Sequence, residues 1–442
     1  MRFELNSSSV ATGAFSENVG QDAAELILRS EDGAEKIVGA TARLGMRREG
    51  KNIVRLDGDD AENLAAQAVR GYFHGAFRIS KDAIRCLKDV YAQRDALCDY
   101  GCGTLCIDCD ADVSAGIRRG LTLARCEGYA RMLGTLPNNF LHVREMADYV
   151  THMAADCGLS CRILGDEVLK TLRCGGILAV NQGSDEPAAL AVLEWRPNGG
   201  APTALVGKGV MFDSGGYHLK DLDGMKGMQL DMCGAATVAE TMEYAARAGL
   251  SQPVIAVLPL VENVISAGSV KMGDVITTMS GKTVEVYNTD AEGRLILCDA
   301  LTYAQQIGGA REVVDLATLT YGCQSALGDE VGGWFCNDRD TARRFEDAFE
   351  RSGEAFWRLP LHERYHQALK WSEVADLANY APGYGAAAST AACFLEEFIE
   401  PDTRWLHLDV VGPATRRGGC DAECKGARGF GLSTLISLLQ AK

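Results

Sequence analysis

The spacing of apolar residues divides the chain into two unlike regions. Before residue 115 the pattern predicts strands at 35–44 and 52–56 and a helix at 59–71. Apolar residues then recur at helical intervals over 114–133, until glycine and proline end the pattern. Beyond that helix, apolar runs alternate with helical stretches. The strands predicted there are 176–181, 189–194, 204–206, 254–259, 284–287 and 312–316, and the clearest helices are 234–247 and 293–307.

Alternating strands and helices are typical of an α/β layered domain with a mostly parallel sheet. We therefore predict a smaller N-terminal α/β domain over residues 1–115 and a connecting helix over 116–136. A larger α/β/α layered domain with a mixed, mostly parallel central sheet is expected over 137–442.

Composition limits the class of protein. The 442 residues are 47% hydrophobic, which supports a large core and excludes a disordered chain. No apolar run approaches the ~20 residues of a membrane helix, and residues 1–13 do not resemble a secretory signal, so we expect a cytoplasmic protein. A net charge of −16 makes nucleic acid and anionic membranes unfavourable partners.

Sixteen cysteines are many for such a protein. The densest group is Cys98, Cys102, Cys106 and Cys109, which lacks the paired C-x2-C spacing of a zinc site. We interpret these residues, and Cys420 with Cys424, as free thiols rather than metal ligands or disulfides.

Two segments resemble catalytic motifs but lack a glycine that each motif requires. Gly281-Lys282-Thr283 resembles the end of a phosphate-binding loop, but Ile276 stands where the first glycine is required. Ser214 resembles a nucleophile in a sharp turn, but Phe212 stands where that motif needs glycine. Neither motif therefore predicts chemistry.

A third motif, His362-Glu363-Arg364-Tyr365-His366, matches the H-E-x-x-H pattern of zinc metalloproteases. Pro360 marks a helix start just before it, and its neighbours are polar or charged, as on a solvated helix. We predict that it is a decoy and that this chain is not a zincin-type protease.

Carboxylates concentrate beyond the ends of predicted strands, where α/β sheets usually bind ligands. Lys208 and Asp213 follow the strand at 204–206, and Lys220 and Asp231 come next along the chain. The strand at 284–287 leads into a further acidic turn with Asp290, Glu292 and Arg294. Four carboxylates brought together repel one another, and divalent metal is the usual compensation. A solvated acidic loop is the alternative on spacing alone.

The acidic turn carries a resemblance. Asn288-Thr289-Asp290-Ala291-Glu292-Gly293-Arg294-Leu295 is similar to the signature octapeptide of the leucyl aminopeptidase family of cytosolic two-metal exopeptidases. The chain also resembles that family at 206–216, 228–237, 315–320, 388–392 and 405–409, so the resemblance spans about residues 116–435. Tyr217 after the double glycine, with the short N-terminal part, resembles the peptidase B branch.

The resemblance implies a metal-dependent aminopeptidase whose catalytic domain is 137–442. Two divalent ions per subunit are expected, Zn or Mn with Co or Mg as alternatives. The ligands that it implies are Lys208, Asp213, Asp231 and Glu292 for the tighter ion and Asp213, Asp290 and Glu292 for the looser one. A hydroxide bridging the ions would attack the first peptide carbonyl, with Lys220 polarising that carbonyl. Arg294 would hold a bicarbonate, the general base, against the backbone of Gly293 and Leu319.

The resemblance also implies peptide substrates with a free N-terminus and a homohexamer. By position, the substrate pocket is expected to be lined by Met228, Thr318, Leu319, Tyr321, Val411 and Ala414. Tyr321 replaces a usual glycine, so smaller or polar N-terminal residues are favoured unless the tyrosine turns away. The alternative function is a DNA-binding or scaffolding relative, against which the acidic charge and the intact ligand set count.

Overall fold

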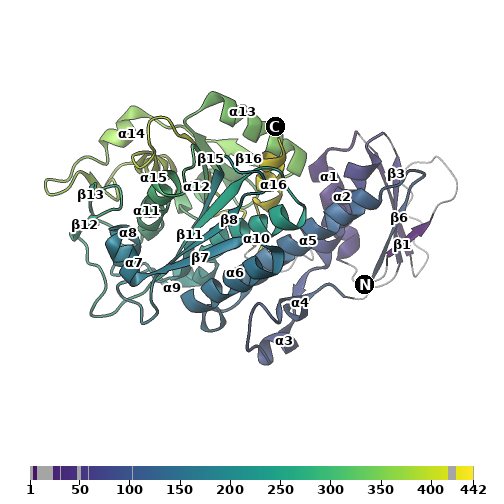
Figure 1. Cartoon of the computed structure of the whole chain (residues 1–442), viewed down its shortest axis with the longest axis horizontal. Coiled ribbons are helices and arrows are strands. Elements are labelled where there is room, and N and C mark those ends of the chain that lie inside the picture. The colour runs from purple at the N-terminus through teal and green to yellow at the C-terminus, as the bar shows by residue number, and fades with distance from the viewer. Residues whose placement is uncertain are drawn as a thin grey trace.

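The computed structural model describes residues 3–6, 23–29, 31–46, 51–57, 59–101, 103–416 and 425–441. A small N-terminal region lies beside a much larger layered body, with the long helix α5 running between them (Figure 1). The elements of the small region are β1 (Phe3–Asn6), β2 (Ala23–Arg29), α1 (Ala34–Gly45), β3 (Lys51–Asp57), α2 (Ala61–Ala76), β4 (Arg78–Ile79), α3 (Lys81–Arg85), α4 (Arg94–Leu97), β5 (Cys98–Asp99) and β6 (Thr104–Asp108).

The small region is built on a parallel sheet with the strand order β1-β6-β3-β2, as far as the described residues show. Helices α1 and α2 pack closely against each other because glycines remove the side chains between them. A Cβ added to Gly75 would lie 1.9 Å from the carbonyl oxygen of Ala42, and one on Gly71 would lie 2.0 Å from Thr41 Oγ1. Any larger residue at either position would force the two helices apart.

Helix α5 (Ser114–Thr135) links the two regions physically. Its first half lies on α2, where a Cβ on Gly116 would come within 2.0 Å of the Glu62 carbonyl oxygen. Its second half is buried in the core of the large body, with Tyr129, Met132 and Leu133 all inaccessible to solvent. The helix lies where the connecting helix was predicted, and the division of the chain into domains around it stays a prediction.

The large body is formed around a mixed sheet with nine strands among the described residues. The strands follow the order β16-β15-β18-β14-β9-β11-β8-β7, with β10 also paired to β11. The central pairs β18–β14, β14–β9 and β9–β11 are parallel, and antiparallel pairs lie towards both edges. The strands are β7 (Ser160–Gly165), β8 (Ala189–Trp195), β9 (Thr203–Gly207), β10 (Gly209–Asp213), β11 (Val254–Asn263), β14 (Glu312–Ala317), β15 (Gly332–Cys336), β16 (Phe356–Arg358) and β18 (Arg404–Asp409).

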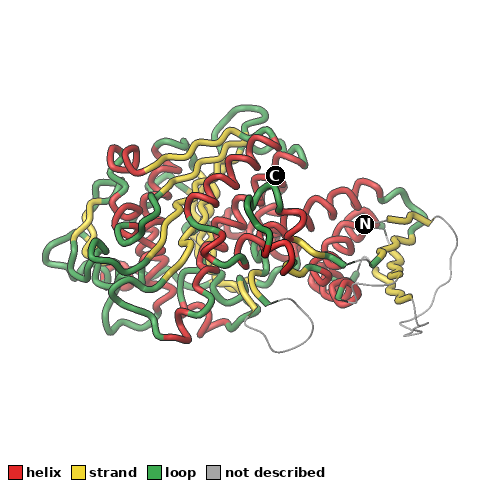
Figure 2. Tube along the Cα trace, turned by 90° about the horizontal axis from the view of Figure 1, so that it is seen from below, coloured by secondary structure: helices red, strands yellow, loops and turns green. Residues whose placement is uncertain are grey.

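Helices cover both faces of this sheet, so the predicted α/β/α fold class is confirmed (Figure 2). The central strand β11 is buried along its whole length, as a continuous apolar run in a parallel sheet should be. One face packs against α5, α6 (Val143–Cys157), α10 (Cys233–Arg247), α13 (Arg339–Ser352) and α16 (Leu432–Gln440), and the other against α7 (Asp166–Thr171), α8 (Gly175–Asn181), α11 (Glu292–Gln306) and α15 (Ala387–Glu396). The remaining elements are η1 (Asn138–Phe140), α9 (Leu222–Met225), η2 (Met228–Met232), β12 (Val275–Thr277), β13 (Thr283–Glu285), α12 (Tyr321–Leu327), α14 (Glu363–Gln367), β17 (Leu377–Ala378), β19 (Thr415–Arg416) and β20 (Gly426–Ala427).

Two predicted strands are wrong, because both segments are helices. Residues 35–44 lie in α1, whose buried positions include Ala34, Ile37 and Thr41, the spacing of a helix. The β-branched residues in this segment favoured the wrong prediction of a strand. Residues 176–181 lie in α8, a short apolar run of the kind that pattern alone cannot assign. A Cβ on Gly176 would meet the Leu295 carbonyl oxygen at 2.0 Å, so α8 packs directly on α11.

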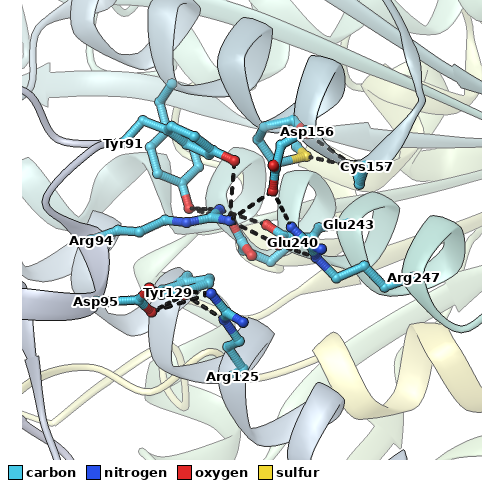
Figure 3. Close-up of polar contacts among 12 residues, drawn as sticks. Tyr91, Arg94, Asp95, Arg125, Tyr129, Asp156, Cys157, Glu240, Glu243 and Arg247 are labelled. Carbon is cyan, nitrogen blue, oxygen red and sulfur yellow. Dashed lines mark hydrogen bonds and ion pairs between the residues drawn. The ribbon is translucent and has the colours of Figure 1, made fainter.

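An ionic network with Arg94 and Glu243 buried at its centre fixes helix α4 against the large body (Figure 3). Arg94 of α4 makes a two-pronged contact with Glu243 of α10, at 2.7 and 3.1 Å. Arg247 donates from Nε to the same carboxylate at 2.6 Å and from Nη2 to Asp156 of α6 at 2.5 Å. The network therefore ties together α4, α6 and α10.

None of the described helices is long and apolar enough to cross a membrane. Cys98, Cys106 and Cys109 are free thiols, while Cys102, Cys420 and Cys424 lie outside the described residues.

Candidate active site

The predicted site residues meet at the carboxyl ends of the central strands. Lys208 is the single residue between β9 and β10, and its backbone N–H donates to the carbonyl of Leu316 near the end of β14. Glycines allow this close packing: a Cβ on Gly234, at the start of α10, would lie 2.2 Å from the same carbonyl oxygen. The sequence G-K-G around Lys208 therefore places its side chain among buried backbone, where few rotamers are open to it.

Lys208 is buried and bound on three sides. Its Nζ donates to Asp231 Oδ1 at 2.7 Å and to the carbonyl oxygen of Thr318 at 2.8 Å, and it lies 2.9 Å from Glu292 Oε1. Gly293 makes room for it, because a Cβ there would come within 2.5 Å of Lys208 Cε. The glycine of the signature turn is therefore required by the neighbouring lysine.

Lys220 binds the other half of the carboxylate cluster. Its Nζ lies 2.8 Å from Asp213 Oδ2 and also pairs with Asp290. Oxygen atoms of Asp213, Asp231 and Glu292 lie within 4.8 Å of one another, so these three buried side chains could hold one metal ion. The structure thus brings together six of the seven residues predicted as ligands or catalytic cations. The seventh, Arg294, lies beside them on α11.

Two loops hold the cluster in place. After Asp213 the chain turns back through Gly215 and Gly216, both with positive φ, and the Gly215 N–H donates to Asp213 Oδ1 at 2.9 Å. Thr289 joins this loop to the signature turn: its Oγ1 donates to the Gly215 carbonyl at 2.6 Å and accepts from the His218 N–H at 2.8 Å. The spacing of the two acidic segments is therefore fixed by Thr289.

Burial and mutual repulsion shift the pKa values of the cluster. Burial, with Glu292 and Asp213 nearby, raises the pKa of Asp231 well above its usual range, although Lys208 opposes the shift. Burial, followed by Asp213 and Glu292, raises the pKa of Asp290 to about 7. For Glu292, burial acts in the same direction, but Lys208 and Lys220 outweigh it and lower the pKa. The two lysines therefore supply too little positive charge for all four carboxylates.

Arg294 is buried without a carboxylate partner among the described residues. Its Nη1 donates to the carbonyl of Asn379 at 2.8 Å, and its Nε has no hydrogen-bond partner. Burial lowers the pKa of Arg294 to about 10. A guanidinium in this state favours an anion beside it.

A cavity of about 630 Å³ opens beside the cluster. Met228, Thr318 and Val411 of the predicted substrate pocket line it, together with Asp231. Of the other three predicted pocket residues, Ala414 is buried, and Leu319 and Tyr321 lie outside its lining. The ring centroid of Tyr321 lies 5.6 Å from Lys220 Nζ, and its hydroxyl donates to the Gly224 carbonyl at 3.3 Å, so the tyrosine stands over the lysine.

Sequence reasoning missed three polar residues that position the site. Asn263 donates to Asp213 Oδ1 at 2.8 Å, and Asn379 accepts from the backbone of the signature turn. Asp409 accepts from the Leu319 N–H at 3.2 Å and from Thr320 Oγ1 at 2.6 Å. Asn263 ends the buried strand β11, a position that strand-end reasoning could have found, whereas nothing in the sequence marks Asn379.

The H-E-x-x-H motif does not bring its two histidines to one ion. His362 precedes the short helix α14, and its Nδ1 accepts from the Arg364 N–H at 3.1 Å. His366 instead pairs with Glu396 and Glu397, both at 3.0 Å. The motif therefore lacks the geometry of a zincin site.

The chain is similar to known proteins in sequence and in structure. Residues 128–436 match the catalytic domain of the cytosol aminopeptidase family. A probable cytosol aminopeptidase of Chlorobaculum tepidum is 41% identical over 388 residues, covering 86% of this chain and 75% of the relative. That of Bacillus subtilis is 43% identical over 335 residues, covering 74% and 66%. Among solved structures, the bottromycin maturation enzyme BotP in complex with Mn is similar at a TM-score of 0.82 and 29% identity, covering 96% of this chain and 99% of that one.

The chain belongs to the cytosol aminopeptidase family. It is a metalloaminopeptidase, a hydrolase that depends on divalent metal.

Proposed function

We propose that the chain removes N-terminal amino acids from peptides with two divalent ions held by the carboxylate cluster. Lys208, Asp213, Asp231 and Glu292 would hold one ion, and Asp213, Asp290 and Glu292 the other. The observation that carries this proposal is the convergence of these side chains at the strand ends, with two lysines bound among them.

The chemistry of the cluster fits two divalent cations. Four carboxylates against two ammonium groups leave two uncompensated negative charges in a buried site. The raised pKa values of Asp231 and Asp290 express that deficit. Oxygen donors with one amine suit Zn or Mn, with Co or Mg as alternatives. When bound, such ions supply the Lewis acidity that makes a water nucleophilic near neutral pH.

Lys208 must lose its proton to act as a ligand. The carboxylates now outweigh burial and raise the pKa of Lys208, because its ammonium is the nearest cation available to them. A divalent ion at the same oxygens would take over that role and favour the neutral amine. The tight packing around Lys208 Cε would keep its Nζ aimed at the cluster in either state.

Lys220 and Arg294 are the proposed catalytic cations. Lys220 Nζ stands beside Asp213 and Asp290, where an ammonium would polarise the scissile carbonyl and stabilise the developing oxyanion. Arg294, with its free Nε, is placed to hold bicarbonate as the general base. The Leu319 N–H, expected to help bind that anion, donates to Asp409 instead, so the proposal assigns the anion to Arg294.

The cavity beside Asp231 is the proposed site for the substrate's first side chain. Met228, Leu230 and Val411 give its lining apolar surface close to the carboxylates, among polar residues such as Lys226 and Gln229. A free α-amino group at the cluster would fix the enzyme on N-terminal residues.

A substrate panel tests the function directly. Metal-loaded protein should hydrolyse aminoacyl amides and leave their N-acetylated counterparts intact, because acetylation removes the amine that the site would bind. Equal hydrolysis of both sets would contradict the proposal. A gel shift at physiological salt tests the DNA-binding alternative, and specific binding together with an inactive panel would favour it.

The family resemblance also supports a cytoplasmic homohexamer. Sedimentation should give a species of about six times 47.4 kDa. A fully active monomer would contradict the assembly while leaving the chemistry intact.

A further inference from the structure

A second group of metal-ligating side chains lies outside the active site. His366 comes from α14, and Cys393 and Glu396 come from α15. One ligand atom of each lies within 4.8 Å of the other two. The spacing of three residues between Cys393 and Glu396 puts both on the same face of α15, directed at His366.

The two ring nitrogens of His366 have different partners, and Nδ1 lies beside a carboxylate, as in known zinc sites. Its Nδ1 lies 3.0 Å from Glu397 Oε1, and its Nε2 lies 3.0 Å from Glu396 Oε2. Metal-binding histidines almost always donate the N–H opposite the metal to a carboxylate, which fixes the tautomer and leaves the second nitrogen free to bind. Glu397 is in turn fixed by Lys370 at 3.1 Å and Lys282 at 3.5 Å. The supporting contact is thus present independently of the three ligand atoms.

Exposure and chemistry both suit an ion. The Cys393 side chain is fully buried, while those of His366 and Glu396 are 17% and 24% exposed, so the site is formed at the protein surface with one open side. Nitrogen, sulfur and carboxylate donors are the set that zinc uses, and three protein ligands leave one position for water. A thiolate also disfavours Mg and Ca, which prefer oxygen.

We propose that His366 Nε2, Cys393 Sγ and a Glu396 carboxylate oxygen bind one zinc-like ion, which joins α14 to α15. This site shares no residue with the carboxylate cluster, and the proposal does not depend on the aminopeptidase chemistry. The H-E-x-x-H motif is not its basis, because the side chains of His362 and Glu363 take no part; the Cys393 thiol contacts only the backbone carbonyl oxygen of His362, at 4.0 Å. The alternative is a metal-free ion pair in which a protonated His366 lies between Glu396 and Glu397; Cys393, Glu396 and Glu397 raise the pKa of His366 to about 11.

Cobalt distinguishes the two, because a thiolate bound to Co²⁺ gives a charge-transfer absorption in the near ultraviolet that oxygen and nitrogen ligands do not. Full-length protein is stripped with a chelator, kept reduced with a phosphine, and titrated with Co²⁺. We expect this absorption to saturate at one thiolate-bound cobalt per chain, in addition to the cobalt that the carboxylate cluster takes up. None of the residues proposed for the active site is a cysteine, so failure here and failure of the proposed function are distinguishable.

Single-residue variants test which side chains produce the cobalt absorption. Cys393→Ser should abolish the absorption, and Glu397→Gln should weaken cobalt binding about 10–100-fold by removing the support of His366. Glu396→Gln tests a surface ligand if Cys393→Ser does not fold. Cys86→Ser and Cys336→Ser, one exposed and one buried free thiol, are matched controls that should keep the absorption. All five variants should retain the parent's aminopeptidase rate within about two-fold.

The proposal is overturned if the parent shows no thiolate absorption, or if Cys393→Ser keeps it. It is also overturned if Glu396→Gln and Glu397→Gln both bind cobalt as tightly as the parent, which would assign the histidine to a plain ion pair.

Discussion

Two buried ionic clusters in this molecule differ in how their charge is balanced. The network around Arg94 joins three helices, and the cluster around Lys208 lies at the ends of the central strands. Both are built from carboxylates and cations at short distances. They differ in the number of carboxyl groups for each cation, which is smaller in the Arg94 network than in the Lys208 cluster.

In the Arg94 network two guanidinium groups, Arg94 and Arg247, face three carboxyl groups. Arg94 and Arg247 pair with Glu243 and Asp156. Burial and the neighbouring Glu243 raise the pKa of Glu240, the third carboxyl group, well above its usual range, and Glu240 accepts from the Tyr149 hydroxyl at 2.7 Å. Because guanidinium groups are permanently charged and planar, they hold these carboxyl groups in a fixed geometry.

In the Lys208 cluster the charges do not cancel. Lysine is a compact charge whose pKa responds to its surroundings, and it can give up its proton when stronger cations arrive. The arginines of the Arg94 network therefore keep their charge and stabilise the fold. The lysines of the Lys208 cluster can lose a proton where a metal ion is proposed to bind. We therefore expect mutations in the Lys208 cluster to lower activity and mutations in the Arg94 network to lower stability.

The largest effect is expected from Glu292→Ala, which removes a carboxylate proposed to contact both ions. Aminopeptidase activity should fall by more than about 100-fold, since loss of a supporting partner alone typically costs 10–100-fold. The fold should persist, because Lys208 keeps Asp231 and Thr318 as partners. Steady-state kinetics and far-ultraviolet circular dichroism measure the two effects. Glu363→Ala, a matched change in the decoy motif, should retain full activity. Near-normal turnover in Glu292→Ala would remove this residue from the site.

The next largest effect is expected from Arg94→Ala, which should lower stability rather than activity. It leaves the fully buried carboxylate of Glu243 with Arg247 alone, so we expect a loss of about 3–5 kcal/mol in the free energy of unfolding. Urea denaturation measures that loss, and folded protein should keep its parental turnover. Arg85→Ala, which breaks an exposed pair with Asp82, is the control and should not change stability measurably. Unaltered stability in Arg94→Ala would mean that the network contributes little.

The two clusters also differ in how far sequence predicts them. Lys208, Asp213 and Glu292 follow predicted strands, which predicted their place, and the resemblance of these segments to a known family implied that they converge. Arg94 and Glu243 are 149 residues apart in unremarkable helical segments, and nothing local joins them. Long-range pairs of this kind depend on how layers stack, which local patterns do not contain.

For the fold, four strands of the central sheet, β8, β9, β11 and β14, were predicted from their apolar runs and the helices between them, whereas β7, β10, β15, β16 and β18 were not predicted. The errors at 35–44 and 176–181 arose where β-branched residues or glycines occupy helices. In both helices the true constraint is close packing: Gly45 and Gly176 have no room for a side chain beside Tyr72 and Leu295. That constraint exists only in three dimensions.

A smaller effect is expected from Tyr321→Gly. The ring stands over Lys220 at the exposed side of the cluster, outside the lining of the cavity proposed for the first side chain, and would narrow the approach of large N-terminal side chains to that cavity. Removing it should shift kcat/KM towards leucine and phenylalanine amides relative to alanine amide by about 10-fold, a size typical of apolar pocket changes. Tyr321→Phe keeps the ring and should keep the parental ranking. If the ranking is the same in Tyr321→Gly, the tyrosine does not face the substrate.

The smallest effect is expected from His362→Ala, which tests whether the H-E-x-x-H motif is a decoy. His362→Ala loses the contact of Nδ1 with the Arg364 N–H at the start of a short helix, a capping interaction of about 1 kcal/mol, and a ring contact with Tyr365 at a centroid distance of 5.5 Å. Peptidase rate should stay within a few-fold of the parent, and metal content should not change, because His362 belongs to neither group of metal-ligating side chains among the described residues. Metal analysis and kinetics on the same preparation measure both. His366→Gln is the informative partner: it should also keep the rate but lose the thiolate-bound cobalt. Loss of activity together with metal in His362→Ala, with the fold intact, would instead make the motif the catalytic site.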